Sequence, residues 1–277
     1  MNASTLPIQY VKVKREKTGI CNICKQPCEL TWDHVPPQGG IDVAPLDQYT
    51  ILEQLTGRED RPKHLETQNG VKFRTVCTQC NRNLLGTEYD PTLNDFALGV
   101  GQFLKTTIKL PSSVGYATKP ARLLRALFGH LLGAKSEVED TKPDQAMREF
   151  VLDKTVPLPQ DLNVFYWIYP YPHVVVIRDV LMPVTRGRFD RMGIFSILKY
   201  FPVAYLVTNL REYENLPSLS FYCPISLDTE VRIPIPMTPP RSAAWPEVVD
   251  NQNFIAGGGS SAHSSIFAIP KGTIIRG

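Results

Sequence analysis

Four of the six cysteines form two Cys-x-x-Cys pairs near the N-terminus, Cys21–Cys24 and Cys77–Cys80. Of the other two, Cys28 lies just after the first pair and Cys223 far along the chain. A disulfide framework would spread its cysteines more evenly, whereas clustered pairs in a reducing compartment are typical of metal sites. Four thiolates around Zn²⁺ form a closed tetrahedral site that stabilises a fold and leaves no open position for catalysis. We therefore expect these pairs to hold a structural zinc ion, with Cys28 as a free or buried thiol or as a substitute for one ligand.

Composition sets the class of protein and limits how it can bind partners. With 43% hydrophobic and 21% charged residues among 277, the chain can bury a core of one or two domains. The formal net charge of +3 is too small for binding by the overall field, so any nucleic-acid contact must come from local patches. We find no secretion signal and no apolar run of the ~18 residues that a membrane span needs. We therefore expect a cytoplasmic protein without membrane contact.

The residue pattern changes twice along the chain. Residues 1–90 are rich in turns, with a short helix expected near Tyr49 to Leu55, and residues 91–156 carry helical periodicity. From 157 to 277 short β-branched and aromatic runs alternate with Pro, Gly and Asn, which indicates an antiparallel sheet. The predicted class is α+β: a small zinc-bound module, a helical segment and a mostly β domain. Expected elements are helices at 92–104, 119–134 and 144–152, and strands at 164–169, 174–180, 194–200, 204–208, 219–223, 231–235 and 266–269.

An acidic residue and a histidine stand between the two cysteine pairs, at Asp33-His34, and an amide, Asn81, directly follows the second pair. Carboxylate and amide oxygens suit a hard divalent cation, and a neutral imidazole can take a proton from water near pH 7. A cation at such a site can stabilise charge that develops on a phosphodiester. An Asp-His dipeptide taken alone is more often a packing pair.

The order C-x2-C, Asp-His-Val-Pro-Pro, C-x2-C-Asn resembles the HNH (His-Me finger, ββα-metal) endonuclease family over about residues 19–90. The resemblance implies a structural zinc on the four cysteines, His34 as general base, and Asp33 and Asn81 as ligands of a catalytic Mg²⁺ or Mn²⁺. Asn69 is the nearest match to the middle Asn of the family's motif, although it lies farther from the second pair than is usual. The segment between His34 and Cys77 is also longer than in minimal members.

The resemblance further implies DNA as the substrate, hydrolysis of phosphodiester bonds, action as a homodimer or with a protein partner, and a role in restriction or phage defence. The densest basic run, Lys12, Lys14, Arg15 and Lys17, precedes the first cysteine pair and is a candidate for phosphate contacts. No nucleotide-binding motif is present, so we expect no nucleotide cofactor. Two other histidines have plain interpretations: His64 lies in a basic, solvated loop, and His130 near the C-terminal end of an apolar helix.

Two other functions remain open from the sequence. The first is a non-catalytic, zinc-stabilised HNH-like module that binds nucleic acid or protein, which the displaced middle Asn favours. The second is a structural subunit in which the β domain does the work. An enzyme needs His34 and a divalent cation besides zinc, whereas a binding module needs neither.

Overall fold

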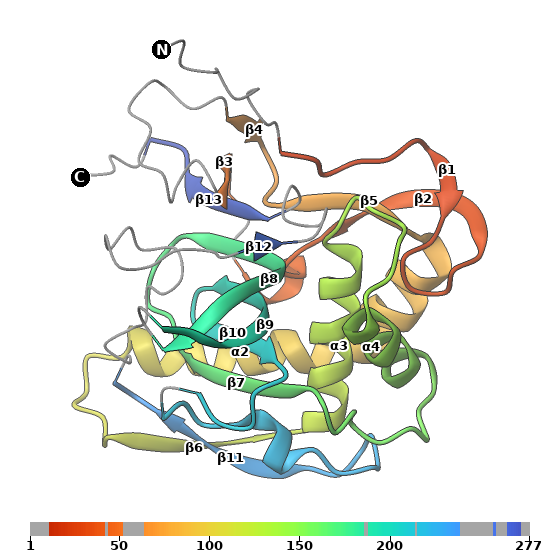
Figure 1. The fold of residues 1–277 in the computed structure, drawn as a ribbon. Coiled ribbons are helices and arrows are strands. Elements are labelled where there is room, and N and C mark those ends of the chain that lie inside the picture. The colour runs from red at the N-terminus through yellow and green to blue at the C-terminus, as the bar shows by residue number, and fades with distance from the viewer. Residues whose placement is uncertain are drawn as a thin grey trace.

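The structure is a computed structural model that describes residues 11–41, 44–51, 64–185, 188–213, 215–238, 257–258 and 265–272. Figure 1 shows a small β-sheet on one side, helices in the middle and a large sheet on the other side. The predicted α+β class with mostly antiparallel strands is confirmed. No helix in the described ranges is both long and apolar enough to cross a membrane.

The small sheet carries the cysteine pairs. It contains β1 (Thr18–Ile20), β2 (Pro27–His34) and β5 (Lys72–Cys77), in the order β1-β2-β5 with antiparallel pairing. A helix with π-type hydrogen bonds, η2 (Gln79–Tyr89), begins directly after β5 and runs into α2 (Asp90–Lys105). A short 3₁₀ turn, η1 (Gln38–Gly40), follows β2. In chain order the module consists of β1, β2, β5 and η2, with η1, β3 and β4 between β2 and β5.

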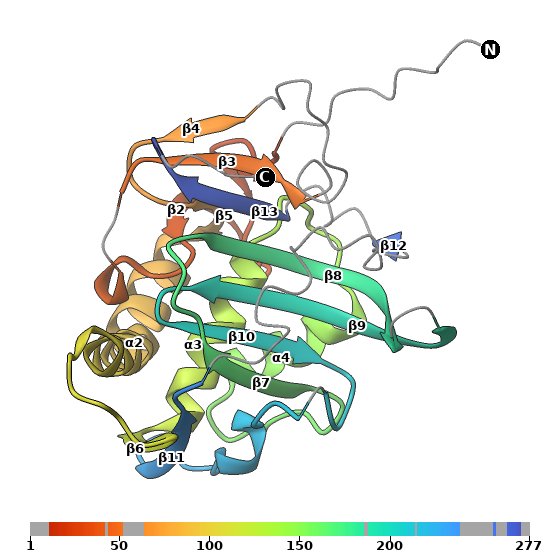
Figure 2. The same cartoon turned by 90° about the vertical axis from the view of Figure 1, so that its left-hand side faces the viewer.

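The large sheet has the order β4-β3-β13-β8-β9-β10-β7, visible from top to bottom in Figure 2, with β12 paired to β8. Every pairing between described strands of this sheet is antiparallel. A separate pair joins β6 to β11. The strands span β3 (Leu46–Thr50), β4 (Leu65–Thr67), β6 (Ser113–Thr118), β7 (Asn163–Ile168), β8 (Val174–Thr185), β9 (Arg188–Tyr200), β10 (Val203–Thr208), β11 (Val231–Pro236), β12 (Gly257–Gly258) and β13 (Ile266–Pro270).

Two local predictions are wrong. Tyr49 and Thr50 belong to strand β3 and pair with β13, so they do not start a helix; residues 52–55 lie outside the described residues. The expected strand at 219–223 is instead a 3₁₀ turn, η3 (Leu219–Tyr222). At this edge of β7, Phe165 pairs with Ser218 in an isolated β-bridge. The Ser220 hydroxyl accepts a hydrogen bond from the Val164 N–H at 2.9 Å. A side chain thus satisfies the backbone group that a ladder would have used.

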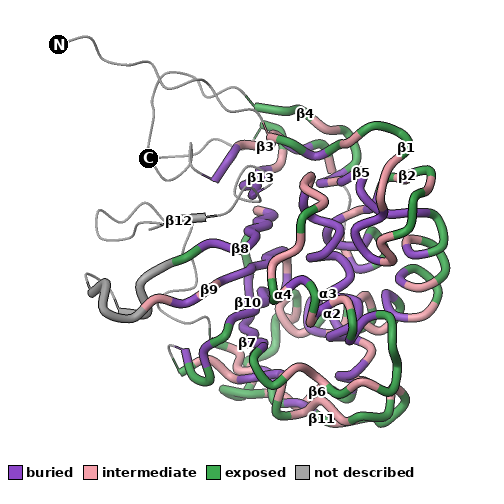
Figure 3. Tube along the Cα trace, turned by 45° about the vertical axis from the view of Figure 1, so that its right-hand side comes forward, coloured by how far each residue is buried: buried purple, intermediate pink, exposed green. Residues whose placement is uncertain are grey.

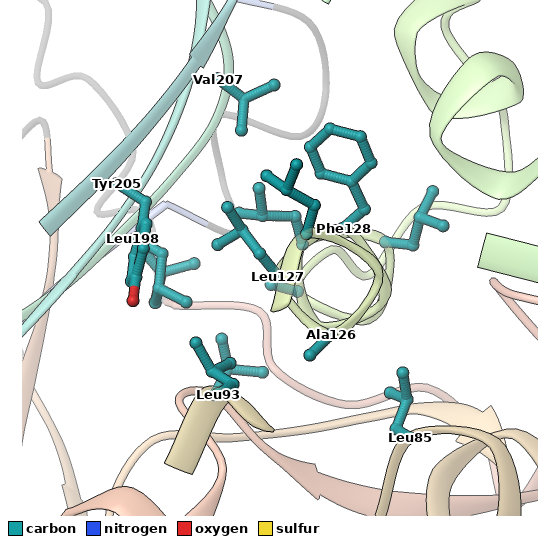
Figure 4. Packing of buried hydrophobic residues seen from close by; sticks show 14 of the residues in the cluster. Leu85, Leu93, Ala126, Leu127, Phe128, Leu198, Tyr205 and Val207 are labelled. Atoms are coloured by element: carbon teal, nitrogen blue, oxygen red, sulfur yellow. The ribbon is translucent and has the colours of Figure 1, made fainter. Parts of the chain in front are cut away.

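The helices fill the space between the two sheets. They are α2, α3 (Pro120–Gly133) and α4 (Lys142–Leu152), and all three agree with the sequence prediction. Leu127 and Phe128 of α3 lie toward Val207 of the large sheet, and Leu85 lies on the opposite side of the helix (Figure 4). Because α3 is covered on every side, nearly all its residues are buried. Glycine is required at position 129, since a Cβ there would lie 2.3 Å from Leu85 Cδ2.

One buried apolar cluster runs from Val13 through the helices to Ala268, so the two sheets share a core, as the continuous buried segments in Figure 3 indicate. Side chains alternate along β7: Tyr166 faces this cluster, whereas Phe165 and Trp167 enter a second cluster on the far face of the sheet. Strands β3 and β4 come from within residues 1–90 but extend the large sheet. A division of the chain at residue 90 therefore does not follow the sheets.

Buried ions tie the helices to the large sheet. The Asp144 carboxylate contacts Lys135 Nζ and lies 2.6 Å from Arg178 Nη2, and Arg178 also lies 3.2 Å from Asp179. Asp144 and Arg178 are 0% exposed and Lys135 is 2% exposed. Burial alone raises the pKa of Asp144, but Arg178 and Lys135 outweigh burial and hold that pKa below its usual range.

Candidate functional site

The four predicted zinc ligands converge. One ligand atom from each of Cys21, Cys24, Cys77 and Cys80 lies within 4.8 Å of the others, and three of the four residues are buried. Cys24 Sγ and Cys77 Sγ are 3.8 Å apart. Two sulfurs bound tetrahedrally at about 2.3 Å to one ion are separated by about this distance. The cluster could therefore hold a metal ion.

Backbone groups around this cluster favour thiolates. The Cys77 N–H points at Cys21 Sγ at 3.3 Å, the Ile23 N–H points at the same sulfur at 3.4 Å, and the Cys80 N–H points at Cys77 Sγ at 3.4 Å. Such donors stabilise negative sulfur and orient the ligands. Cys28 stays outside the cluster: its Sγ is 3.7 Å from the Gly19 carbonyl oxygen, and burial raises its pKa to about 11.

Asp33 points into the protein. It is 3% exposed, and its Oδ2 lies 3.1 Å from Nδ1 of His130 on α3. The other ring nitrogen of His130 lies 2.9 Å from Asp90 Oδ1, at the start of α2. Burial lowers the pKa of His130, but the two carboxylates outweigh burial and raise it well above its ordinary value. His130 is therefore a buried imidazolium that holds Asp33 by one oxygen.

His130 and Asp90 were not predicted as part of the site. His130 lies near the C-terminal end of an apolar helix, α3, as expected, but it is 0% exposed and its side chain meets two carboxylates instead of only the helix end. A signal was present in the sequence: His130 lies three residues after Leu127, within the apolar stripe that faces the core. A polar side chain at such a position needs a buried partner.

His34, the predicted general base, lies at the end of β2 and points to the opposite side of that strand from Asp33. One ring nitrogen bonds to the backbone carbonyl of Asn69, whereas Nε2 is enclosed and has no hydrogen-bond partner. Burial lowers the pKa of His34, and the charge of Lys72 lowers it further, while Asp33 and the Asn69 carbonyl act in the opposite direction. The imidazole is therefore neutral at neutral pH, with one nitrogen fixed as donor and the other left as acceptor.

Asn81 is the third predicted site residue, and its side chain reaches β2. Its Nδ2 donates to Thr31 Oγ1 at 3.0 Å and to the Trp32 carbonyl at 2.8 Å, immediately before Asp33. Its Oδ1 makes no hydrogen bond to a described residue, and the same holds for Asp33 Oδ1. The donor set left available is thus one carboxylate oxygen and one amide oxygen, which fits Mg²⁺ or Mn²⁺. In the described part of the chain, no side-chain hydrogen bond joins any two of Asp33, His34 and Asn81.

The residues of the basic run before the first cysteine pair differ in their exposure and in their contacts. Lys12 and Lys14 are exposed, and Lys17 pairs with Glu29 at 3.0 Å at the surface. Arg15 turns inward: its Nη2 donates to the Asn22 side chain at 3.0 Å and to the Thr75 carbonyl at 2.7 Å. Its observed role is to hold the first cysteine turn against β5. Within the described part of the chain, Lys12 and Lys14 remain free for phosphate contacts.

A second group with metal-ligand chemistry consists of Asp47 on β3, Glu66 on β4 and His64 just before β4, with one ligand atom from each within 4.8 Å of the others. It is more exposed than the cysteine cluster, and Lys271 already binds Glu66 at 2.5 Å. Comparisons of this chain with protein-family models, with curated proteins and with solved structures gave no match.

Proposed function

We propose that this chain is a metal-dependent endonuclease of the HNH type that hydrolyses DNA phosphodiester bonds. The observation that supports this most is the state of His34: a neutral imidazole, fixed by the Asn69 carbonyl, with an enclosed Nε2 that lacks a partner. An acceptor nitrogen without a protein partner can bond a water molecule or a substrate oxygen and receive a proton from it.

The division of roles follows from the free atoms. His34 Nε2 accepts the proton of the attacking water, and the Asn69 carbonyl keeps the proton on the opposite nitrogen of the ring. Asp33 Oδ1 and Asn81 Oδ1 are the atoms that would hold Mg²⁺ or Mn²⁺, with His130 fixing the Asp33 carboxylate from behind. Bound there, the cation would stabilise negative charge on the phosphate.

We assign zinc to the four-cysteine cluster. Four thiolates with closed coordination suit Zn²⁺ and leave it no position for substrate, so its role is structural. The cluster joins the end of β5 and the first turn of η2 to the turn after β1, and thereby holds Asn81 against β2. Metal content measured on purified protein is expected to give one zinc per chain.

The test is cleavage of supercoiled plasmid by zinc-loaded protein with added Mg²⁺ or Mn²⁺. We expect nicking or linearisation that is lost with EDTA and with His34→Ala, while His64→Ala, at a partly exposed histidine, leaves it unchanged. The zinc content of every sample must be measured so that loss of activity is not loss of fold. Cleavage that survives His34→Ala would contradict the assignment.

Two observations favour the non-catalytic alternative. The first is that Asp33 and His34 point to opposite sides of β2, so the proposed metal ligand and the proposed base do not face one another. The second concerns access to Asp33. Asp33 is 3% exposed and is already bound by His130, so a cation has little access to it in this conformation. If the zinc-loaded protein binds DNA but never cleaves it with any divalent cation, a binding module is the better description.

A further inference from the structure

The outer face of the β2–β5 pair carries four side chains that form a compact block: Trp32, His34, Lys72 and Arg74. The strand register places Trp32 opposite Arg74 and His34 opposite Lys72. Between them, Asp33 and Phe73 point inward and are buried. Because side chains alternate along a strand, the four outward residues lie on one surface, with the candidate base at one corner.

Trp32 is unusual in its exposure. It leaves 44% of its surface exposed although it lies in the middle of a paired strand. Two cations border its ring: Arg74 Cζ lies 5.4 Å and Lys72 Nζ 5.9 Å from the ring centroid. An exposed aromatic ring between two cations has the chemistry of a stacking platform for a base in a single strand.

The two cations differ in freedom. Arg74 is held in place, because its Nε and Nη2 donate to the Arg15 carbonyl at 3.0 and 2.7 Å. Lys72 makes no side-chain hydrogen bond or salt bridge to a residue that the structure describes, so its ammonium is available. Lys14 is exposed and its backbone pairs with that of Arg74 in an isolated β-bridge, which adds a third positive charge beside β5.

Nearby carboxylates do little to cancel these charges. Asp33 lies on the inner side of β2 with His130, and Glu29 pairs with Lys17. Glu16 is the remaining exposed acid in the adjoining segment. The outer face therefore combines a positive charge with an open aromatic ring, a combination that complements a nucleic-acid strand better than an apolar protein surface.

We propose that this outer face binds an unpaired stretch of DNA, with one base stacked on Trp32 and the neighbouring phosphate on Lys72. Inside a duplex the base faces are covered by stacking on their neighbours, so the surface favours single-stranded or locally unpaired DNA. The part of the proposal that brings the strand to His34 rests on the proposed nuclease function; the binding itself does not.

The test measures binding of zinc-loaded protein to a labelled 20-nucleotide oligothymidine and to a blunt duplex of the same length, with Ca²⁺ as the only added cation. Wild type is expected to prefer the single strand. Trp32→Ala should weaken single-strand binding about 5- to 150-fold and remove the preference, whereas Trp32→Phe should keep most of it. Phe221→Ala is the matched control, because Phe221 is an 85% exposed aromatic residue on η3.

Lys72→Ala is expected to weaken binding to both DNAs and to lower the slope of log affinity against log salt by about 0.7 on the single strand, one phosphate contact. Its control is Lys105→Ala, an exposed lysine whose Nζ lies 5.6 Å from the Phe201 ring. Equal affinity for both DNAs, or Trp32→Ala binding within twofold of wild type, would overturn the proposal. DNA binding that depends on Trp32 but is not followed by cleavage would contradict the proposed nuclease function and support the single-strand binding surface. Cleavage that is unchanged in Trp32→Ala would support the nuclease function and contradict the binding surface.

Discussion

Replacing His130 by asparagine would leave the carboxylates of Asp33 and Asp90 buried without the cation between them. Asparagine is shorter and uncharged, so it cannot bridge contacts of 3.1 Å and 2.9 Å on opposite sides of one ring. Breaking a buried ion pair from one side costs about 3–5 kcal/mol. Since most domains are stable by only about 5–15 kcal/mol, we expect a large loss in the free energy of unfolding.

The chain supplies a matched control at His64. Its Nε2 also faces two carboxylates, at 3.8 Å from Asp47 and 3.6 Å from Glu66, but the His64 side chain is 37% exposed. Exposed pairs contribute about 0–1 kcal/mol because water screens them. His64→Asn should therefore change the free energy of unfolding by less than about 1 kcal/mol.

Urea unfolding of zinc-loaded protein, analysed for both midpoint and slope, measures these differences. The raised pKa of His130 fixes their dependence on pH. The stabilisation is fully present below the unfolded pKa near 6.5 and is lost only as pH rises through the higher folded value. The difference in free energy of unfolding between wild type and His130→Asn should thus stay constant from about pH 5 to 6 and shrink as pH rises above about 6.5. If His130→Asn lowers the free energy of unfolding by less than about 1 kcal/mol, or by as little as His64→Asn does, His130 is not a buried imidazolium.

Two other changes test the supports of the site. Cys80→Ser should abolish stoichiometric zinc binding and unfold the small module, since structural zinc contributes about 10 kcal/mol or more to folding. Cys28→Ser is the control and should keep one zinc per chain. Metal analysis of both purified variants measures the difference. Asp144→Asn should destabilise the protein by about 3–5 kcal/mol at pH 7, because Lys135 and Arg178 lose their shared carboxylate. Because the pKa of Asp144 is lowered in the folded protein, its contribution to stability is present above pH ~4 and is lost as pH falls through the still lower folded pKa. Unfolding measured between pH 7 and 2 would follow this loss. An Asp144→Asn variant as stable as wild type at neutral pH would contradict this role.

Much of the architecture could be predicted because it depends on local pattern. The spacing of Leu123, Leu127 and Leu131 identifies α3, and short β-branched runs identify strands β7 to β10 and β13 of the large sheet, although not β3, β4 or β12. The cysteine pairs identify the cluster because the chemistry of four thiolates depends little on the rest of the chain. At Tyr49 the local sequence pattern favours a helix, but pairing with β13 makes this residue part of strand β3.

The surroundings of the site were not predictable in the same way. The contact between Asp33 and His130 joins residues 97 positions apart, and no local rule specifies which acid a buried histidine will meet. The inward turn of Arg15 likewise depends on the Thr75 carbonyl of β5. The three residues of the HNH-like motif were identified by sequence order alone; their roles in catalysis stay a prediction.

The central claim is that His34 takes the proton from the attacking water. The most direct measurement is the single-turnover rate of DNA cleavage with saturating Mg²⁺, for wild type, His34→Ala and His64→Ala at equal zinc content. General-base catalysis predicts a rate about 10²- to 10⁴-fold lower for His34→Ala and no change for His64→Ala. A His34→Ala rate within a few-fold of wild type would contradict the claim.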